Sequence, residues 1–462
     1  MKKFKASMLV TAMLVSVLSG CGSNTGSNSN SEEPATQGNA TNGAATTKEE
    51  TKAEQVTIKY YNWDNELQAE STKKYIAGFE AKYPNVKVES VSLVPGNSLE
   101  SLKKLDVLAA SGESIDVAVL PNLSELNKRA AQGVLAPLDD FFAQEGINPA
   151  DEYYTNAKFG GKNYGIQNNI TTNFILLNKD ALDEVGLPVP NADWTWDDFR
   201  EYAKKLNKGE GTTKRYGTYF HSWSIYMNPA AQVHMLHPFL TEEGTTNFSD
   251  PSFTNFFNLR RAMEVEDKSA KPYADVIGAK LAYRAEFFNE QAAMLLAGSW
   301  MINEVGDVEK FPHTFKTAFA PVPVEKAGDS KDIFMGGNFL SVGSSSKHKE
   351  EAYQFARYLS MDLSDARTEL PGWKKGDAKP LVERLIGQNK DLYDVDSLMY
   401  TLFDAGINAL PPSKNDIAYG ADLEKVLIDG FSKFILDNQS AEEVQKWMVD
   451  EANKIIAKNT AK

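Results

Sequence analysis

The sequence predicts an α/β protein with two lobes, and three observations lead to this fold class. Apolar residues alternate between strand and helix spacing over residues 56–120, which favours a mainly parallel sheet covered by helices. Residues 56–462 are too many for one simple core and suit two domains or lobes. Hydrophobic residues make up 42% of the chain and aromatic residues 11%, which is typical of a soluble globular protein.

The opening region begins with a strand, because Val56, Ile58 and Tyr60 recur at every second position. A helix follows and ends at Pro84, which cannot continue it. The further elements expected here are a strand at 86–91, a helix at 99–108 that ends near Gly112, and a strand at 115–120.

Polar and aromatic residues follow two of these strands. Trp63, Asp64 and Asn65 come directly after the first strand, and Asn122 follows the third. In open α/β sheets, ligands bind outside the carboxyl ends of the strands. The pattern therefore places these four side chains at one edge of the sheet.

The middle of the chain mixes turns, extended segments and helix starts. Residues 161–165 read as a hairpin turn, and an extended run at 166–177 contains the polar pair Asn168-Asn169 where a buried strand would be apolar. Thr195 and Asp198 form a capping-box pattern that predicts a helix start. Other features are an irregular aromatic stretch at 216–240 and a segment rich in small residues at 287–301.

The C-terminal part is predicted to be helical after a glycine-rich segment at 334–343. A helix is expected at 347–359, followed by two more. Ser440 and Glu443 form a second capping box at the start of the last helix.

The N-terminal segment has the order of a secretory signal peptide at residues 1–20: three lysines, an apolar run and small residues. Its Leu18-Ser19-Gly20-Cys21 ending resembles a bacterial lipobox, which implies cleavage before Cys21 and lipid attachment there. An ordinary signal peptide followed by a chance cysteine is the alternative. Residues 22–55 are polar and would form a disordered tether with a root-mean-square reach of roughly 30–35 Å.

Charge and motifs exclude several classes of protein. The formal net charge of −14 argues against nucleic acid as a partner. A single cysteine leaves no disulfide and no CxxC metal site. Hydrolase, phosphate-loop and HExxH motifs are absent, so no catalytic residue and no cofactor are predicted. His234 and His237 have helical metal spacing, but no further ligand is placed beside them, and no metal site is expected.

Taken in order, several segments resemble the extracellular solute-binding proteins of bacterial ABC importers, family 1, which includes maltose-binding protein and other oligosaccharide binders. Besides the lipobox and the tether, the matching segments are the strand-helix-strand Val56–Val91, which contains Phe79–Val86, and Ile115–Val117, Gly133–Asp139, Gly161–Ile166, Leu177–Asp180, Trp194–Asp198, Ala292–Met294, Gly298–Trp300, Gly336–Asn338 and Ser344–Lys347. Each match is weak by itself, but together they cover nearly the whole mature chain.

The resemblance implies a two-lobe periplasmic-binding-protein-like fold of type II, with a hinge of three chain crossings. The crossings are expected at 164–177, 334–343 and 406–413. Lobe 1 would then comprise 56–163 with 344–405, and lobe 2 would comprise 178–333 with 414–462.

The resemblance also implies a ligand site between the lobes. Aromatic faces would cover sugar rings, and polar groups would bind the hydroxyls. The predicted ligand-binding residues are Trp63, Asp64, Asn65, Asn122, Trp223, Tyr226, Trp300, Gly337 and Asn338, with Trp300 stacking on a ring. Trp373 and Tyr419 are weaker candidates, Asp116 is expected to cap or orient, and Trp194, Trp196 and Trp447 are expected in the core.

The expected function is the lipid-anchored, monomeric binding component of an ABC importer, on the outer face of the cytoplasmic membrane. It would bind a carbohydrate, with an oligosaccharide favoured, and dock on permease subunits that work with a cytoplasmic ATPase. The long tether favours a Gram-positive host. Two alternatives remain open: the same fold binding a peptide or another polar solute, and a secreted glycoside hydrolase, which would need two separated carboxylates across a cleft.

Overall fold

A computed structural model describes residues 54–227, 239–331, 336–387, 389–407 and 417–460, together with the backbone of 333–334 and 409–410. Residues Ala53–Lys462 form one compact unit. The predicted signal peptide, Cys21 and nearly all of the predicted tether lie outside the described residues, as do His234 and His237. None of the helices in the described ranges is long and apolar enough to cross a membrane.

The first of two large sheets is mainly parallel, as the sequence predicts. Its strand order is β2-β1-β3-β12-β6, and only β12 runs against its neighbours β3 and β6. The strands are β1 (Val56–Asn62), β2 (Val86–Ser92), β3 (Val117–Leu120), β6 (Ile166–Gln167) and β12 (Phe339–Val342).

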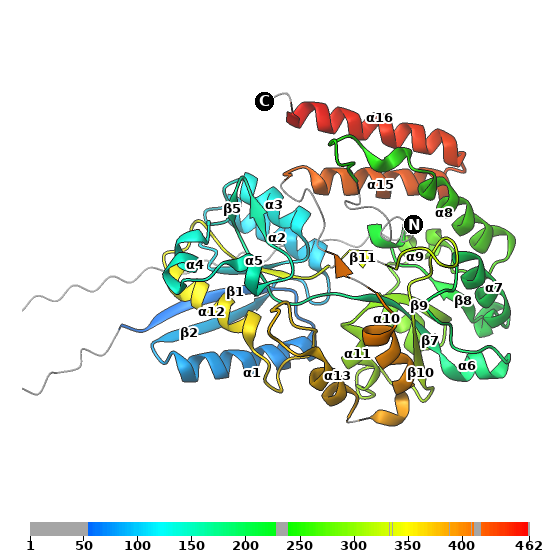
Figure 1. The fold of residues 1–462 in the computed structure, drawn as a ribbon, viewed down its shortest axis with the longest axis horizontal. Coiled ribbons are helices and arrows are strands. Elements are labelled where there is room, and N and C mark those ends of the chain that lie inside the picture. The colour runs from blue at the N-terminus through cyan, green and yellow to red at the C-terminus, as the bar shows by residue number, and fades with distance from the viewer. Residues whose placement is uncertain are drawn as a thin grey trace, which may run out of the picture. The chain divides into compact units, whose positions relative to one another are not determined.

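Helices cover both faces of the first sheet (Figure 1). Ile58 and Tyr60 point to a core shared with α1 and α12, whereas Tyr61 points to a second core shared with α2 and α3. This alternation is the period of two that the sequence indicates. The helices on this sheet are α1 (Glu66–Lys82), α2 (Ser98–Ala110), α3 (Leu123–Ala131), α4 (Asp139–Glu145), α5 (Pro149–Glu152) and α12 (Lys349–Met361). A hairpin of β4 (Lys158–Phe159) and β5 (Lys162–Asn163) is present, but its turn lies at residues 160–161, so part of the turn predicted at 161–165 is strand β5.

The second sheet is mixed and has the strand order β10-β7-β9-β8. Its strands are β7 (Asn173–Asn178), β8 (Tyr216–Tyr219), β9 (Ala292–Gly298) and β10 (Thr317–Pro321). Alternate residues of β7 again enter two different cores: Phe174 and Leu176 on one face, Ile175 and Leu177 on the other. The strand β8 lies in the stretch that the sequence predicts to be irregular.

The helices packed on or beside the second sheet are α6 (Lys179–Glu184), α7 (Trp196–Leu206), α8 (Pro251–Arg261), α9 (Tyr273–Gly278), α10 (Tyr283–Phe288), α11 (Met301–Val305), α13 (Ala378–Ile386) and α14 (Val395–Met399). α15 (Gly420–Ile435) and α16 (Ala441–Thr460) pack with α8 around a further core. The predicted capping box of α16 is present, with Ser440 and Glu443 hydrogen-bonded to each other's backbone N–H.

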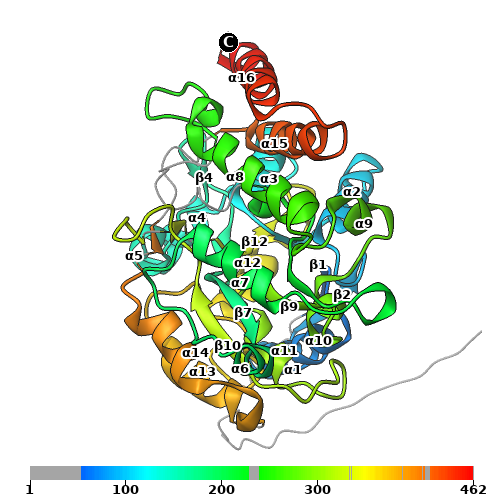
Figure 2. The ribbon, with the colours of Figure 1, turned by 90° about the vertical axis from the view of Figure 1, so that its right-hand side faces the viewer.

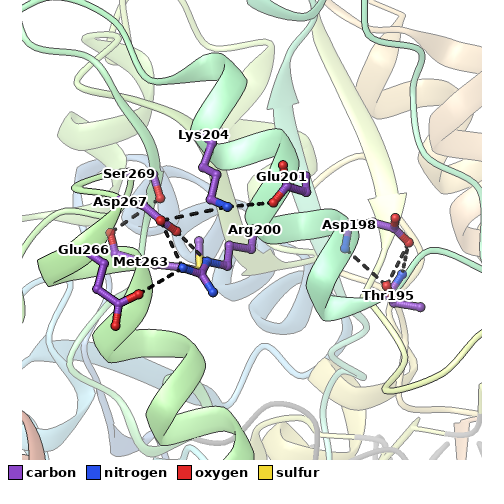
Figure 3. Close-up of polar contacts among 9 residues, drawn as sticks. All are labelled: Thr195, Asp198, Arg200, Glu201, Lys204, Met263, Glu266, Asp267 and Ser269. Atoms are coloured by element: carbon purple, nitrogen blue, oxygen red, sulfur yellow. Dashed lines mark hydrogen bonds and ion pairs between the residues drawn. The ribbon is translucent and has the colours of Figure 1, made fainter.

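The first turn of α7 forms as the sequence predicts, with Thr195 and Asp198 in a capping box (Figure 3). One turn later, Arg200 pairs with Asp267 at 2.5 Å and with Glu266 at 3.3 Å. These carboxylates lie in and just after a π-helical turn that extends α8, so the ion pairs fasten α7 to the end of α8. Trp194 and Trp196 are buried in a core on the second sheet, as expected.

The chain passes between the two sheets three times in the described ranges. It leaves the first sheet after β6, returns to it before β12, and leaves it again after α12, because α13 and α14 pack on the core of the second sheet. Figure 2 shows α13 and α14 beside β10. The packing therefore puts the third passage at residues 362–377.

The passage predicted at 406–413 lies partly outside the described residues, and its strand β13 (Ala409–Leu410) pairs with β11 (Ile333–Phe334). Residues 378–405, which the sequence assigns to lobe 1, include helices that pack with lobe 2. The cause is packing: Leu381, Val382 and Leu398 fill the core under β7 and β10.

Candidate functional site

The first candidate region lies where β1 ends. Trp63 and Asp64 follow the strand, and Asn65 begins α1 in a capping box with Gln68. The Asp64 backbone is held on both sides, since its N–H donates to Asn62 and its carbonyl accepts from the Ser92 hydroxyl. This local geometry fixes the carboxylate of Asp64 beside the first turn of α1.

A small polar cavity of about 70 Å³ opens at this point. We call it the acidic pocket, after the carboxylates of Asp64 and Glu369. It is lined by Tyr60, Asn62, Trp63, Asp64, Gln68, Ser71, Thr72, Tyr75, Val119, Asn168, Asn338, Leu359, Arg367, Thr368 and Glu369. The lining comes from strand ends, from α1 and α12, and from all three passages between the sheets.

The carboxylate of Asp64 is held by a hydroxyl group of α1. Thr72 Oγ1 donates to its Oδ2 at 2.6 Å. Burial raises the pKa of Asp64 to about 6, against the smaller opposite effect of the Thr72 hydrogen bond. The charged form is therefore retained at neutral pH at a free-energy cost.

Glu369 enters the pocket from the third passage. Asn169 Nδ2 donates to its Oε2 in a very short contact. Burial raises the pKa of Glu369, the charge of Asp64 raises it further, and Arg367 and the Asn169 hydrogen bond lower it. Arg367 itself is 2% exposed, and its guanidinium donates to backbone carbonyls.

Backbone hydrogen bonds tie the three passages together beside the pocket. Asn168 N–H donates to the Asn338 carbonyl at 2.8 Å, and Asn338 N–H donates to Asn169 Oδ1 at 2.6 Å. Ile170 N–H donates to the Leu370 carbonyl at 2.9 Å. Gly337 has φ +150°, and a Cβ there would lie 2.1 Å from the Asn169 carbonyl oxygen, so only glycine fits.

The second candidate region is a group of rings at the end of the second sheet. We call it the aromatic cluster, formed by His221, Trp223, Tyr226, Tyr283 and Trp300. Trp223 is central, with its ring centroid 5.4 Å from Tyr283 and 6.1 Å from Trp300. Trp223 and Trp300 are half-buried, and both pack against the core beneath β7 and β9. Edge-to-face contacts of this kind hold aromatic rings in fixed orientations.

A buried ion pair supports the cluster. Trp300 Nε1 donates to Tyr283 Oη at 3.1 Å, and the Arg284 guanidinium lies 4.5 Å from the Tyr283 ring centroid. Arg284 binds Glu304 with two nitrogens, at 2.7 and 2.6 Å. Burial raises the pKa of Glu304 and the Arg284 charge lowers it, which is the expected balance for a desolvated pair.

His221 is neutral in this environment. Burial, helped by the charge of Arg284, lowers the pKa of His221 to about 4. Its Nδ1 lies 2.9 Å from Tyr219 Oη, whose hydroxyl donates to the Leu281 carbonyl at 3.2 Å. Because that hydroxyl proton is already used, Nδ1 is the donor to Tyr219.

The acidic pocket and the aromatic cluster are neighbours at the hinge. The charge of Glu369 contributes to the raised pKa of Tyr283, and the charge of Glu304 contributes to that of Glu369. A Cβ built on Gly298 would meet both the Trp300 ring and Thr171, which belongs to the first passage. The two regions therefore meet around residues 168–172.

Four predicted site residues have structural roles in the described ranges. Tyr226 is 1% exposed, and its hydroxyl donates to the Leu296 carbonyl at 2.5 Å, so it backs the aromatic cluster from the core. Asn65 and Asn122 cap α1 and α3 through their side-chain oxygens. Gly337 provides the close approach between two passages.

The remaining candidates also have partners. Asp116 is buried and accepts from Ser346 and from the Lys59 N–H, which fits the orienting role expected for it. Trp373 Nε1 donates to Glu152, and Tyr419 lies in the core around α15. Trp447 packs on that core, as expected. The described residues contain no group of three potential metal ligands.

The sequence prediction does not include Glu369, Arg367 or Tyr283 in the site. The polar pair Asn168-Asn169 does stand out in the sequence as an interruption of an apolar run, and it joins Glu369 to the pocket. No comparable signal marks Glu369, which lies between two helices without periodicity.

Two α/β sheets, three passages between them and a polar pocket where the passages meet define the two-lobe class of substrate-binding proteins. The chain belongs to the bacterial extracellular solute-binding protein family, whose model matches residues 63–360.

Named relatives and solved structures agree with this assignment. The multiple sugar-binding protein of Streptococcus mutans serotype c is 24% identical over 334 residues, which are 67% of this chain and 72% of that protein. The sn-glycerol-3-phosphate-binding periplasmic protein UgpB of Escherichia coli strain K12 is 23% identical over 61% of this chain and 64% of its own length. An ABC substrate-binding protein from Listeria monocytogenes, solved with cycloalternan, has the same fold, with a TM-score of 0.70 and 23% identity over 87% of this chain and 100% of that one.

Proposed function

We propose that this protein is the lipid-anchored substrate-binding component of an ABC importer, and that it captures an oligosaccharide between its two lobes. The observation that carries the proposal is the meeting of the aromatic cluster and the acidic pocket at the hinge. Sugar rings have apolar faces and a rim of hydroxyls, and these two regions offer a matching surface for each.

In this proposal the half-buried rings of Trp300 and Trp223 cover sugar faces. Asp64, Glu369 and Asn338 accept or donate hydrogen bonds to hydroxyls, with Trp63 at the edge of the pocket. Tyr226, Asn65, Asn122 and Gly337 act indirectly, because their side chains or backbones already hold the surrounding structure. The names of the relatives, which cover sugars and a glycerol phosphate, are consistent with a hydroxylated ligand.

We further propose that lobe 1 ends after α12 and that α13 and α14 belong to lobe 2. Ligand binding would favour a closed arrangement of the lobes, and the closed form would dock on the permease. The hydrogen bonds among the three passages would serve as the hinge of this motion.

The test is calorimetric titration of the unit Ala53–Lys462 with mono- and oligosaccharides, beside Trp300→Ala and Trp447→Ala. One glycan class should bind, Trp300→Ala should weaken its binding at least about 100-fold, and Trp447→Ala, outside the site, should not. The bound glycan should be recovered intact.

Two outcomes favour other functions. If no glycan binds, and a peptide or another polar solute titrated beside the glycans does bind, that solute would replace sugar as the ligand class. A glycan recovered in cleaved form would indicate a glycoside hydrolase instead. Asp64 and Glu369 would then be the two carboxylates to substitute, because the pKa of each is raised.

The anchor is tested separately. Cells expressing the full chain should incorporate a labelled palmitate analogue into the protein, on the outer face of the cytoplasmic membrane. Cys21→Ala should abolish the label and release the protein. A labelled Cys21→Ala variant would contradict attachment at this residue.

A further inference from the structure

The charges that face the acidic pocket do not balance. Asp64 and Glu369 contribute two carboxylates, and among the described lining residues Arg367 alone carries a guanidinium or ammonium group. Each carboxylate accepts a side-chain hydrogen bond at one oxygen, from Thr72 for Asp64 and from Asn169 for Glu369. With both acids ionised, the pocket carries one negative charge in excess.

Arg367 is not available to a ligand. Its Nε donates to the Glu369 carbonyl at 3.2 Å, its Nη1 to the Leu359 carbonyl at 2.8 Å, and its Nη2 to the Asn168 carbonyl. A guanidinium that is 2% exposed and bound to three carbonyls cannot turn to form the two-pronged contact by which arginine binds phosphate or carboxylate groups.

Three further cations on elements beside the described passages are also bound to carboxylates. Arg284 is held by Glu304, and Lys310 lies 3.5 Å from Glu70 and 3.8 Å from Asp307. Arg384 binds Asp365 and the carbonyls of Ser364 and Arg367. A ligand anion in the pocket would therefore meet two carboxylates, while these four described cations are already bound to other groups.

The carboxylate of Glu369 cannot easily move aside. Asn169 donates to it through Nδ2 and at the same time accepts from the Asn338 N–H through Oδ1. Rotation of Glu369 away from the pocket would leave the buried amide of Asn169 without this acceptor, which is unfavourable. The negative surface is thus part of the hinge structure.

We propose that Glu369 and Asp64 determine the charge of the ligand. They admit a hydroxyl or a protonated amine into the acidic pocket and exclude phosphate and carboxylate groups. This inference rests on the proposed function, since it concerns the ligand of the same site. Hydroxyls and amines donate hydrogen bonds to carboxylates, whereas an anion would add like charge in a partly desolvated space.

The test uses probes that differ in charge on one scaffold. The unit Ala53–Lys462 is titrated at pH 7.5 with four sets of probes. Two sets are monosaccharides: glucose, glucosamine and glucose 6-phosphate, and galactose, galactosamine and galacturonate. The third set holds the trimers of glucose, glucosamine and galacturonate, and the fourth holds glycerol and sn-glycerol 3-phosphate. In each set the anion should bind at least about 10-fold more weakly than the neutral or amino member. An anion that binds as tightly as its neutral counterpart would overturn the proposal.

The variants Asp64→Asn and Glu369→Gln, combined, should reduce this difference to less than about 3-fold. Glu145→Gln is the control, because Glu145 pairs with Arg357 outside the pocket and should leave the difference unchanged. If the double variant does not fold, the two single variants replace it, and a difference that neither of them reduces would overturn the proposal.

The outcomes separate this inference from the proposed function. If a neutral sugar binds no better than its phosphate, the protein is still a sugar receptor, but the acidic pocket does not exclude anions. If neutral or amine-bearing peptides bind and acidic peptides do not, the ligand is not a sugar, but the exclusion of anions by the acidic pocket still holds.

Discussion

The acidic pocket and the aromatic cluster lie side by side at the hinge, but different interactions hold them. The pocket is shaped by backbone: its polar side chains hydrogen-bond to the passages between the sheets. The cluster is shaped by side chains, which pack edge to face in front of one buried ion pair. A substitution far from the ligand can therefore disturb either region, but it acts through different parts of the structure.

The largest effect is expected where the aromatic cluster depends on one charge pair. Glu304→Gln should lower the free energy of unfolding by about 3 kcal/mol, because Arg284 would remain largely buried without its carboxylate. Urea unfolding followed by Trp fluorescence measures this.

The control for Glu304 is Glu451→Gln, which removes an exposed pair with Lys454 and should change the free energy of unfolding by less than about 0.5 kcal/mol. Equal effects of the two variants would mean that the ion pair does not support the cluster.

The pocket should be most sensitive at a backbone position. Gly337→Ala should destabilise the protein by about 1–3 kcal/mol, because φ +150° is unfavourable for alanine and the new Cβ would lie 2.1 Å from the Asn169 carbonyl oxygen. Gly336→Ala is a matched neighbour, since its nearest atom would lie at 3.5 Å, and it should be tolerated. Thermal unfolding measures the stability of both variants. Equal melting temperatures would contradict the clash expected between a Cβ at position 337 and the Asn169 carbonyl oxygen.

How far the sequence predicts these two regions depends on the range of the interactions. Strand and helix periodicity is local, so the opening of the fold and the positions of Trp63 and Asp64 are predicted correctly as the end of β1. Glu369 is not predicted, because its partner Asn169 lies 200 residues away in the chain. No local pattern contains that pairing.

The third passage illustrates the same limit. Helical periodicity can indicate that α13 forms, but it cannot say which sheet the apolar face covers. Leu381 and Val382 would suit either core, and the structure places them in the core under the second sheet. Boundaries that follow from packing partners are therefore the part of a two-lobe fold that sequence patterns determine least.

A pH titration sharpens the comparison further. Because the pKa of Asp64 is raised to about 6 from an ordinary value of 3.8, the folded state binds its proton more tightly than the unfolded state. Stability from this group is present at low pH and is lost as pH rises from about 4 to 6. Asp64→Asn should therefore stabilise the protein by about 1–3 kcal/mol at pH 7.5, with the gain vanishing toward pH 4.

His221 in the aromatic cluster should behave with the opposite sign. Since the pKa of His221 is lowered to about 4 from 6.5, its contribution is lost as pH falls through this range. Unfolding measured at pH 7.5 and 4.5 for Asp64→Asn and His221→Gln separates the two. An Asp64→Asn gain that is independent of pH would show that the buried charge is not its cause.

The smallest effect on the free energy of unfolding is expected at an exposed ion pair between the two lobes. Lys310, from the segment after α11, lies 3.5 Å from Glu70 of α1, and Glu70 is 59% exposed. Glu70→Gln should change the free energy of unfolding by less than about 0.5 kcal/mol at low salt and by nothing measurable at 1 M salt, because an exposed pair is screened. Glu66→Gln, one turn earlier on the same helix, provides the control. If Glu70→Gln lowers the free energy of unfolding by more than 1 kcal/mol, surface charge joins the two lobes in addition to the backbone passages. The structure around the hinge would then depend on a surface ion pair as well as on the hydrogen bonds of the acidic pocket and the ring packing of the aromatic cluster.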